Sequence, residues 1–177
     1  MASAKQKQDI VVQIATDFKG IDVCLPKLKK LVKTICNRFT RQQRPHRTPD
    51  GGDTRYEISI AVVGDAEIRN INSQFLNRKS TCDCLSFDLS DDEGPQSSKL
   101  FELVVNGEMA VEQANLRGHS SQAELALYIT HGLLHNLGFD DSTQSGAQKM
   151  HDTEDEILQQ FGYGPVYNRS KRISNIE

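Results

Sequence analysis

The segment HGLLHNLGFDD constrains the fold of this chain more than any other stretch. It ends a longer run, SSQAELALYITHGLLHNLG, that is rich in alanine and leucine, both strong helix formers. Ser120 or Ser121 can cap the start of this helix, and Gly138 can end it. His131 and His135 stand four residues apart, so a helix places both imidazoles on one face. We therefore expect a helix that presents two histidines toward one point near its C-terminal end.

These two histidines and Asp141 form a candidate site for one divalent metal ion. Imidazole nitrogens bind zinc at about 2.0–2.1 Å, and carboxylate oxygens bind it at about 2.0–2.2 Å. Gly138 can adopt the left-handed conformation that turns the chain back, which brings Asp141 beside the histidines. A histidine pair at this spacing also arises by chance or within a packed core, but the added glycine and aspartate favour a metal. Zinc is the expected ion, and iron or manganese also suits two nitrogens with one carboxylate.

The composition predicts a single globular domain in a reducing compartment. The chain has 177 residues, of which 37% are hydrophobic and 25% are charged. No apolar run approaches the roughly 18 residues that span a bilayer, and the opening MASAKQKQDI lacks the apolar region of a secretory signal. No C-x-x-C pair occurs among the four cysteines, which are Cys24, Cys36, Cys82 and Cys84. We expect a cytoplasmic protein with reduced thiols, in which Cys82 and Cys84 point to the same face of a strand.

Strands and helices are expected to mix along the chain in one α+β domain, residues 1–162, followed by a loose polar tail, 163–177. Apolar and alternating runs predict strands at 10–15, 56–64 and 82–89, and a strand within 103–111 that a hairpin or bulge interrupts at Asn106-Gly107. Periodic apolar spacing predicts further helices that begin at Pro26, at the cap residue Asp65 and near Thr143.

Basic residues are concentrated between Lys27 and Arg47, although the formal net charge is −3. Eight of them occur there without an acidic residue. Such a run can bind phosphate, or it can simply form a solvated helix face followed by a charged loop, and the pattern supports both equally. The candidate phosphate-binding residues of this run are Lys29, Lys30, Lys33, Arg38 and Arg41.

Several segments together resemble one known family. HGLLHNLGFDD resembles the signature H-G-x-L-H-x-x-G-x-D-H of the YbeY family of metal-dependent endoribonucleases. NGEMAV is similar to the family's G-D-I strand, and Met150 and Glu154 fit the helix after its metal loop. INSQFLNRKSTCDCLSFDL is similar to the family segment L-N-x-x-[YF]-x₆-T-D-V-L-S-F, with matches at Asn72, Phe75, Asp83, Leu85, Ser86 and Phe87. The likeness covers most of residues 9 to 162.

The resemblance implies a small fold in which one helix of the zincin type presents zinc ligands beside a four-stranded sheet. It also implies cleavage of single-stranded RNA in small-subunit ribosomal RNA maturation and ribosome quality control, with ribosomal RNA and the small ribosomal subunit as partners. The family's ligands correspond to His131, His135 and Asp141. A water on such an ion has a lowered pKa, and either this water or the RNA 2′-hydroxyl can be the nucleophile. Arg78 and Lys79 are further candidate RNA contacts, and solvated loop charges explain them equally well.

The sequence departs from the family pattern at three positions. Asp141 replaces a histidine, and its shorter side chain requires either a closer loop or a bridging water. Leu76 replaces an arginine, whose charge Arg78 can supply, and Cys82 replaces a threonine.

Three other side chains lie near enough in the sequence to compete with Asp141 as the third ligand. Asp140 matches an aspartate of the signature that is not a ligand. His119 and His151 lie in flanking segments, where an exposed or supporting position explains each of them better than ligation.

Two other functions stay open. A site without its third ligand would leave a ribosome-assembly factor that binds RNA without cutting it. A zinc protease is the other alternative, but the residue after the first histidine of an HExxH protease is a glutamate that acts as general base. The corresponding residue here is Gly132, which favours phosphodiester over peptide cleavage.

Overall fold

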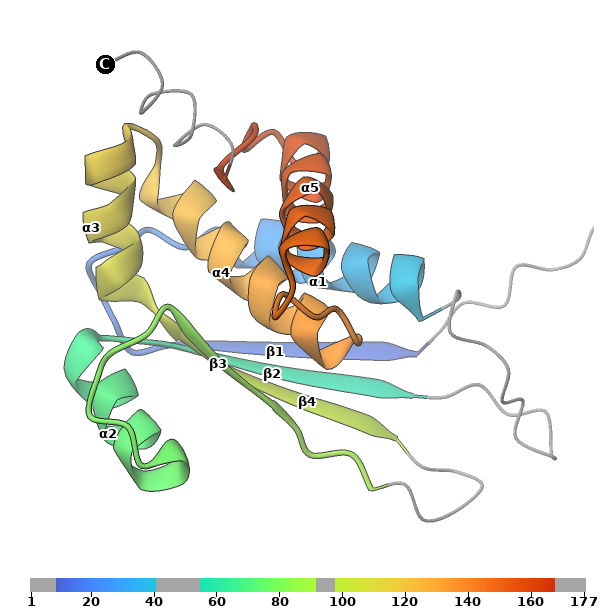
Figure 1. Cartoon of the computed structure of the whole chain (residues 1–177), viewed down its shortest axis with the longest axis horizontal. Coiled ribbons are helices and arrows are strands. Elements are labelled where there is room, and N and C mark those ends of the chain that lie inside the picture. The colour runs from blue at the N-terminus through green and yellow to red at the C-terminus, as the bar shows by residue number, and fades with distance from the viewer. Residues whose placement is uncertain (1–8, 41–54, 92–97, 168–177) are drawn as a thin grey trace, which may run out of the picture.

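The computed structural model describes residues 9–40, 55–91 and 98–167 (Figure 1). Its elements follow one another in the order β1 (Ile10–Thr16), α1 (Leu25–Phe39), β2 (Tyr56–Val63), α2 (Asp65–Leu76), β3 (Cys84–Asp88), β4 (Lys99–Asn106), α3 (Gly107–Arg117), α4 (Ser121–Asn136) and α5 (Gln144–Gln160). None of the helices within these ranges is long and apolar enough to cross a membrane.

The strands form one mixed sheet of four strands in the order β1-β2-β4-β3, which confirms the predicted α+β fold. β1 and β4 both pair with β2 in parallel, and β3 pairs with β4 in the antiparallel direction. β2 is therefore an interior strand, as predicted from a sequence that alternates and then becomes wholly apolar. Its residues Ile58, Ile60 and Val62 are buried.

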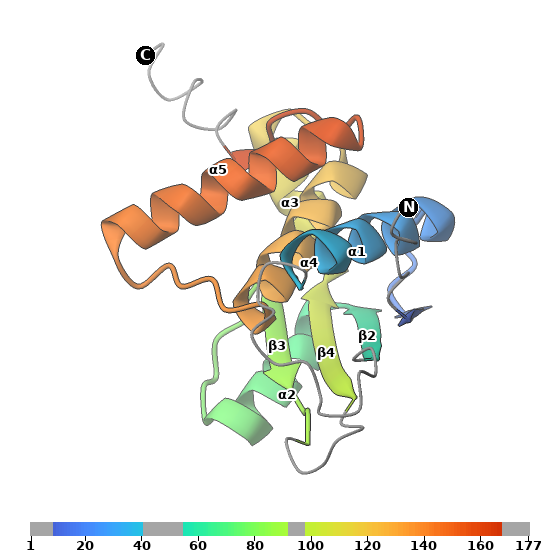
Figure 2. The same ribbon diagram turned by 90° about the vertical axis from the view of Figure 1, so that its right-hand side faces the viewer.

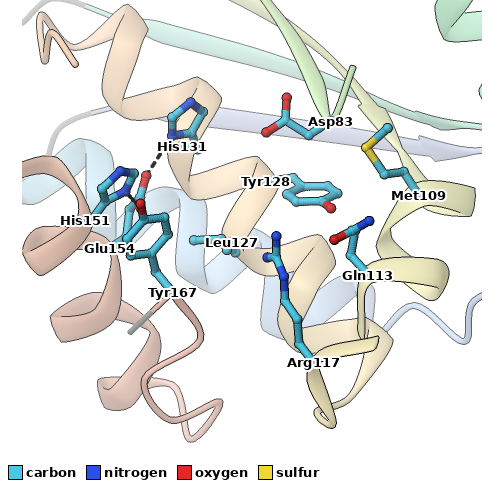
Figure 3. A pocket seen from close by; sticks show the side chains of 10 residues that line it. All are labelled: Asp83, Met109, Gln113, Arg117, Leu127, Tyr128, His131, His151, Glu154 and Tyr167. Carbon is cyan, nitrogen blue, oxygen red and sulfur yellow. Dashed lines mark hydrogen bonds and ion pairs between the residues drawn. The ribbon is translucent and has the colours of Figure 1, made fainter. Parts of the chain in front are cut away.

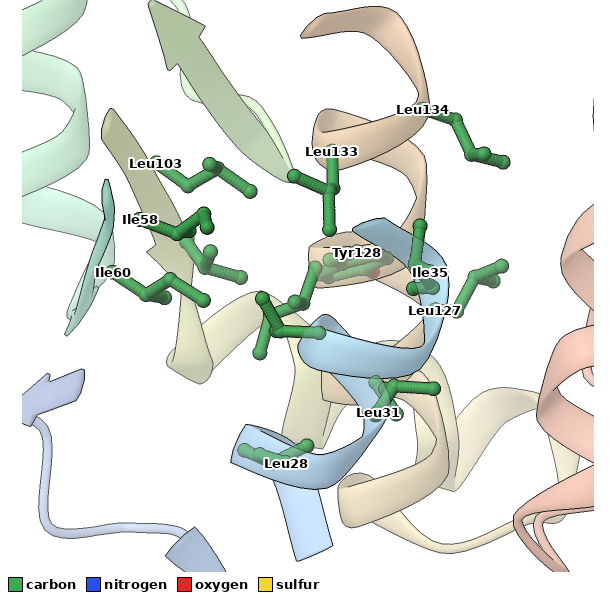
Figure 4. Close-up of a cluster of buried hydrophobic side chains, with 14 of the residues drawn as sticks. Leu28, Leu31, Ile35, Ile58, Ile60, Leu103, Leu127, Tyr128, Leu133 and Leu134 are labelled. Atoms are coloured by element: carbon green, nitrogen blue, oxygen red, sulfur yellow. The ribbon is translucent and has the colours of Figure 1, made fainter. Parts of the chain in front are cut away.

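Helices cover both faces of this sheet. In Figure 1, α1, α4 and α5 lie above the sheet and α2 lies below it, and Figure 2 shows the same arrangement from the side. The larger core lies between the sheet and the upper helices and contains Ile35 of α1, Leu133 of α4 and Leu103 of β4 (Figure 4). A smaller cluster beneath the sheet joins Ile68 of α2 to strand residues that include Leu85.

The histidine-bearing helix α4 is the central helix of the larger core. It is buried on nearly all sides, and Leu133 is completely inaccessible to solvent. A Cβ atom at Gly132 would lie 2.6 Å from Sγ of Cys84, so the helix packs directly on the sheet beside His131. Truncation of Leu133 to alanine would cost about 2–5 kcal/mol of unfolding free energy. This close packing of α4 on the sheet therefore fixes the position of His131 relative to β3.

Both ends of α4 follow the predicted signals. The hydroxyl of Ser120 accepts a hydrogen bond from the backbone N–H of Ala123 at 3.2 Å, which caps the first turn. Gly138 has φ of 87°, a left-handed conformation that ends the helix and turns the chain toward Asp141.

The prediction of a hairpin or bulge at Asn106-Gly107 is wrong. β4 ends at Asn106, whose side chain accepts a hydrogen bond from the backbone N–H of Met109 at 3.0 Å. Asn106 thus caps α3, a helix that the sequence interpretation missed. An Asn-Gly pair serves both tight turns and helix starts, and the residues that follow it decide between them.

Two predictions near α2 and β3 are also wrong. Asp65 is the first residue of α2 and not its cap, because its carboxylate instead accepts hydrogen bonds from Thr81 and from Asn106. Cys82 and Cys84 pack against different clusters, below and above the sheet respectively. β3 begins only at Cys84, so strand alternation does not extend to Cys82.

Packing continues past the predicted start of the polar tail. Val166 is buried, and its backbone N–H and that of Tyr167 each donate to Oδ1 of Asp155 at 2.9 Å. The remainder of the tail, 168–177, lies outside the described residues.

Candidate metal centre

The structure brings His131, His135 and Asp141 together at the C-terminal end of α4. Each offers one ligand atom, and these atoms lie within 4.8 Å of one another. The two histidine Nε2 atoms are 3.2 Å apart. Oδ2 of Asp141 lies 3.7 Å from Nε2 of His135 and 4.0 Å from Nε2 of His131. This is the group of three side chains that the sequence motif predicts.

The spacing of these three atoms fits one divalent ion. A circle through points separated by these distances has a radius of about 2.1 Å, which equals the usual distance of nitrogen and oxygen ligands from zinc. The shorter aspartate therefore reaches the same point as the two imidazoles without a bridging water. Two nitrogens and one carboxylate oxygen also suit iron and manganese.

Hydrogen bonds on the opposite side of each ring aim the histidines at this point. Nδ1 of His131 lies 2.8 Å from Oε1 of Glu154, and Nδ1 of His135 lies 3.1 Å from the backbone oxygen of Phe139. Each acceptor assigns the ring proton to Nδ1, so that Nε2 keeps a free lone pair. The two rings are perpendicular, and both Nε2 atoms face Asp141.

Glu154 of α5 supports the centre from beneath His131. Its side chain is only 1% exposed, and its second oxygen lies 2.9 Å from Nδ1 of His151. The ring of His151 stacks on Tyr167 at 3.5 Å between centroids. Burial alone would lower the pKa of His131, but the hydrogen bond and charge of Glu154 outweigh it, with help from Asp83 and Asp141, and the pKa is raised.

The side chains that competed with Asp141 have other partners. Asp140 is exposed, and its carboxylate accepts hydrogen bonds from the backbone N–H and the hydroxyl of Ser142 at 2.9 and 2.8 Å. His119 bonds Glu124 before the other end of α4, and His151 supports His131 only through Glu154. Among the described residues, the ligand group therefore contains none of the three.

A pocket of about 250 Å³ adjoins His131 between α3, α4 and α5 (Figure 3). The ring of His131 forms one end, where Asp83 and Glu154 also lie, and Arg117 enters from the end of α3. The complete lining is Asp83, Met109, Gln113, Arg117, Leu127, Tyr128, His131, His151, Glu154 and Tyr167. Sequence reasoning missed Arg117 and Tyr167, since neither belongs to a motif. The family segments did contain Asp83 and Glu154, without a role.

The loop that carries Arg78 and Lys79 is held on the other face of the sheet. It follows Asn77, which has a left-handed φ of 53°, and the side chain of Asn72 donates to the backbone oxygen of Ser80 at 2.7 Å. Arg78 and Lys79 are both exposed, so they are available for contact with an anion.

The basic residues of α1 divide into two groups. Lys29, Lys30 and Lys33 lie on the exposed side of the helix. Arg38 makes two hydrogen bonds to Glu156 of α5, at 3.0 and 2.8 Å, and lines a depression that also includes Gly138. Arg41 lies outside the described residues. Of these candidates, Arg38 is the one that the structure places beside the loop leading to Asp141.

Comparisons with known proteins point to one family. Residues 13–162 match the family described as Endoribonuclease YbeY. Endoribonuclease YbeY of Finegoldia magna is 34% identical over 110 residues, which cover 62% of this chain and 72% of that protein. Endoribonuclease YbeY of Halalkalibacterium halodurans is 29% identical over 150 residues, which cover 80% of this chain and 91% of that protein.

A solution structure of a Thermotoga maritima protein has the same fold. It matches with a TM-score of 0.52 at 20% identity and covers 91% of this chain and 95% of that chain. The match to the family extends over the sheet, the histidine helix and the loop with Asp141. This chain therefore belongs to the YbeY family of endoribonucleases.

Proposed function

We propose that this protein cleaves phosphodiester bonds in single-stranded RNA at a divalent metal ion held by His131, His135 and Asp141. The observation that carries the proposal is the common point, about 2.1 Å from two imidazole nitrogens and one carboxylate oxygen, in a chain of the endoribonuclease family. Zinc is the proposed ion. When bound, such an ion polarises a phosphoryl oxygen and lowers the pKa of water.

The chain's own residues prepare this chemistry by fixing the ligands before RNA binds. Glu154 and the backbone oxygen of Phe139 hold the Nδ1 protons, so neither ring needs to rotate. His131 is 23% exposed and His135 is 32% exposed, which leaves the centre open to solvent and to a substrate. Because Asp141 is anionic, it attracts a cation to the common point more strongly than a neutral third ligand would.

A protease is less well supported than a nuclease. Gly132 occupies the position of the general-base glutamate, and it lies against Cys84 and Leu103 of the sheet. A carboxylate introduced there would be forced into the core. The alternative of an assembly factor without cleavage requires a lost third ligand, whereas Asp141 lies within reach of both histidines.

We further propose that the physiological substrate is the precursor of small-subunit ribosomal RNA and that the protein acts on the small ribosomal subunit. This proposal rests on the family and on the exposed cations Arg78 and Lys79. Cells in which His131→Ala replaces the wild-type protein should accumulate unprocessed precursor ends. Normal ends in such cells would contradict a role in maturation.

Neighbouring carboxylates provide a matched test of cleavage. Asp141→Asn removes the anionic ligand, and Asp140→Asn changes an adjacent exposed carboxylate while keeping an oxygen for Ser142. We expect cleavage of a labelled single-stranded RNA to fall to background in Asp141→Asn and in His131→Ala, and to persist in Asp140→Asn. Cleavage at the wild-type rate by His131→Ala would contradict the proposal.

A further inference from the structure

We propose that the pocket beside His131 is a nucleotide subsite in which Arg117 binds a phosphate of the RNA. This inference rests on the proposed function, because it assigns part of the substrate to a place next to the metal centre. The ring of His131 belongs to both regions, since it lines the pocket and directs Nε2 toward Asp141. A nucleotide in the pocket would therefore lie directly beside the ligand group.

The side chain of Arg117 is a cation that a buried carboxylate holds in place. Its Nη1 donates to Oε1 of Glu124 at 2.7 Å, and Glu124 is completely buried. The other carboxylate oxygen of Glu124 is bonded to the ring of His119. Glu124 thus anchors one edge of the guanidinium, which restricts its rotation before any ligand binds.

The other edge of this guanidinium is available to a ligand. Figure 3 shows the Arg117 side chain extending into the pocket toward Tyr128, and the side chain remains 32% exposed. Within the described part of the chain, Nη2 and Nε have no hydrogen-bond acceptor. A planar guanidinium with two free donors suits a phosphate, which it can bind through two parallel hydrogen bonds.

The polarity of the pocket also suits one nucleotide. Arg117 and the amide of Gln113 lie at one end, Asp83 lies nearer His131, and Leu127 and Met109 supply apolar surface. The carboxylate of Asp83 can accept a hydrogen bond from a base. The volume of about 250 Å³ is below the roughly 300–1,000 Å³ of sites for drug-sized ligands, so the pocket holds one nucleotide at most.

The charged groups around Arg117 include its partner Glu124 and the pocket carboxylates Asp83 and Glu154. Burial, together with the charge of Glu124, raises the pKa of Tyr128, so its phenol stays neutral beside the guanidinium. The carboxylate of Glu154 shares its two oxygens between His131 and His151.

The obvious variant, Arg117→Gln, would leave the buried carboxylate of Glu124 without its cationic partner and so could unfold the chain. The double variant Arg117→Gln/Glu124→Gln removes both charges together and keeps side chains of similar size. Glu124→Gln alone keeps the Arg117 cation. Arg55→Gln is the matched control, because Arg55 is 53% exposed at the start of β2 and pairs with Glu57 outside the pocket.

The measurement is binding of a short fluorescent oligouridylate at several salt concentrations, with thermal unfolding recorded for each variant. We expect the folded double variant to bind about tenfold more weakly than wild type, because a charged hydrogen bond is lost. Its slope of log affinity against log salt should be smaller by about 0.7, the value for one single-strand phosphate contact. Arg55→Gln should keep the wild-type slope, and Glu124→Gln, which keeps the cation, should lose less of the slope than the double variant does.

Two results would overturn the pocket assignment while leaving the proposed function intact. One is a folded double variant with wild-type affinity, and the other is a weakened affinity with an unchanged salt slope. Failure of the wild-type protein to bind or cleave single-stranded RNA would instead overturn the proposed function, so the two failures are distinct.

Discussion

A histidine–glutamate pair lies at each end of α4, and the two pairs have different roles. Near each end, a histidine bonds a buried glutamate: His131 bonds Glu154 of α5 at the C-terminal end, and His119, which precedes α4, bonds Glu124 in its first turn. The carboxylate of Glu154 accepts the hydrogen bond from Nδ1 of His131, which leaves Nε2 of that ring exposed beside Asp141. The carboxylate of Glu124 is instead bonded to Nε2 of His119, and the ring of His119 is only 4% exposed.

This difference shows that the choice of ring nitrogen and its exposure determine what a histidine–glutamate pair can do. At the C-terminal end, the free nitrogen faces solvent and a second histidine 3.2 Å away. At the other end, Nδ1 of His119 is buried and has no hydrogen-bond partner among the described residues. We therefore assign a metal-binding role to the first pair and a structural role to the second, in which Glu124 anchors Arg117.

The largest expected effect on stability comes from the structural end. Glu124→Ala removes the buried carboxylate that bonds both Arg117 and His119, and loss of its charged hydrogen bond to the partly exposed Arg117 costs about 1.5–3 kcal/mol of unfolding free energy. Urea unfolding measures this loss. Metal content of the folded fraction should stay unchanged, and a parallel loss of metal would show that the two ends are not independent.

At the metal end, the corresponding change should act on affinity. Glu154→Gln keeps the size of the side chain but weakens the bond that orients His131. Removal of such a supporting contact usually lowers metal affinity by about 10–100-fold. Competition with a chelator measures the affinity, and Glu156→Gln, an exposed change on the same helix, provides the control. Equal metal affinities in Glu154→Gln and Glu156→Gln would show that Glu154 does not support the metal centre.

The smallest expected effect is a pH dependence of the metal-free protein. Because the folded-state pKa of His131 lies above the usual 6.5, its protonated form is favoured on folding. The resulting stabilisation is fully present below about pH 6.5 and is lost as pH rises through the folded pKa. Unfolding curves of wild type and His131→Gln should therefore differ more at low pH than at high pH. A difference that grows with rising pH would contradict the raised pKa.

The sequence predicted the ligand end of α4 because its information is local. The four-residue spacing of the histidines, the glycine stop and the following Asp141 all lie within eleven residues. The same applies to the interior position of β2, whose sequence alternates and then becomes wholly apolar. These features follow from periodicities of helices and strands that any short window contains.

Contacts between distant segments were out of reach of the same reasoning. Glu154 lies 23 residues after His131 and on another helix, and no spacing rule connects the two. Arg117 belongs to α3, whose first residues the sequence interpretation assigned to a strand with a hairpin or bulge, because Asn106-Gly107 also marks tight turns. The pocket could therefore be found only once the packing of α3, α4 and α5 was known.

The most direct test of the account is the amount of metal per chain, measured by mass spectrometry on protein purified without a histidine tag and without added metal. We predict about one divalent ion per chain, held by the one ligand group found among the described residues. The ion should be lost in Asp141→Ala and retained in Asp140→Asn. A wild-type value near zero that zinc, iron or manganese does not restore would contradict the metal centre and, with it, the proposed cleavage.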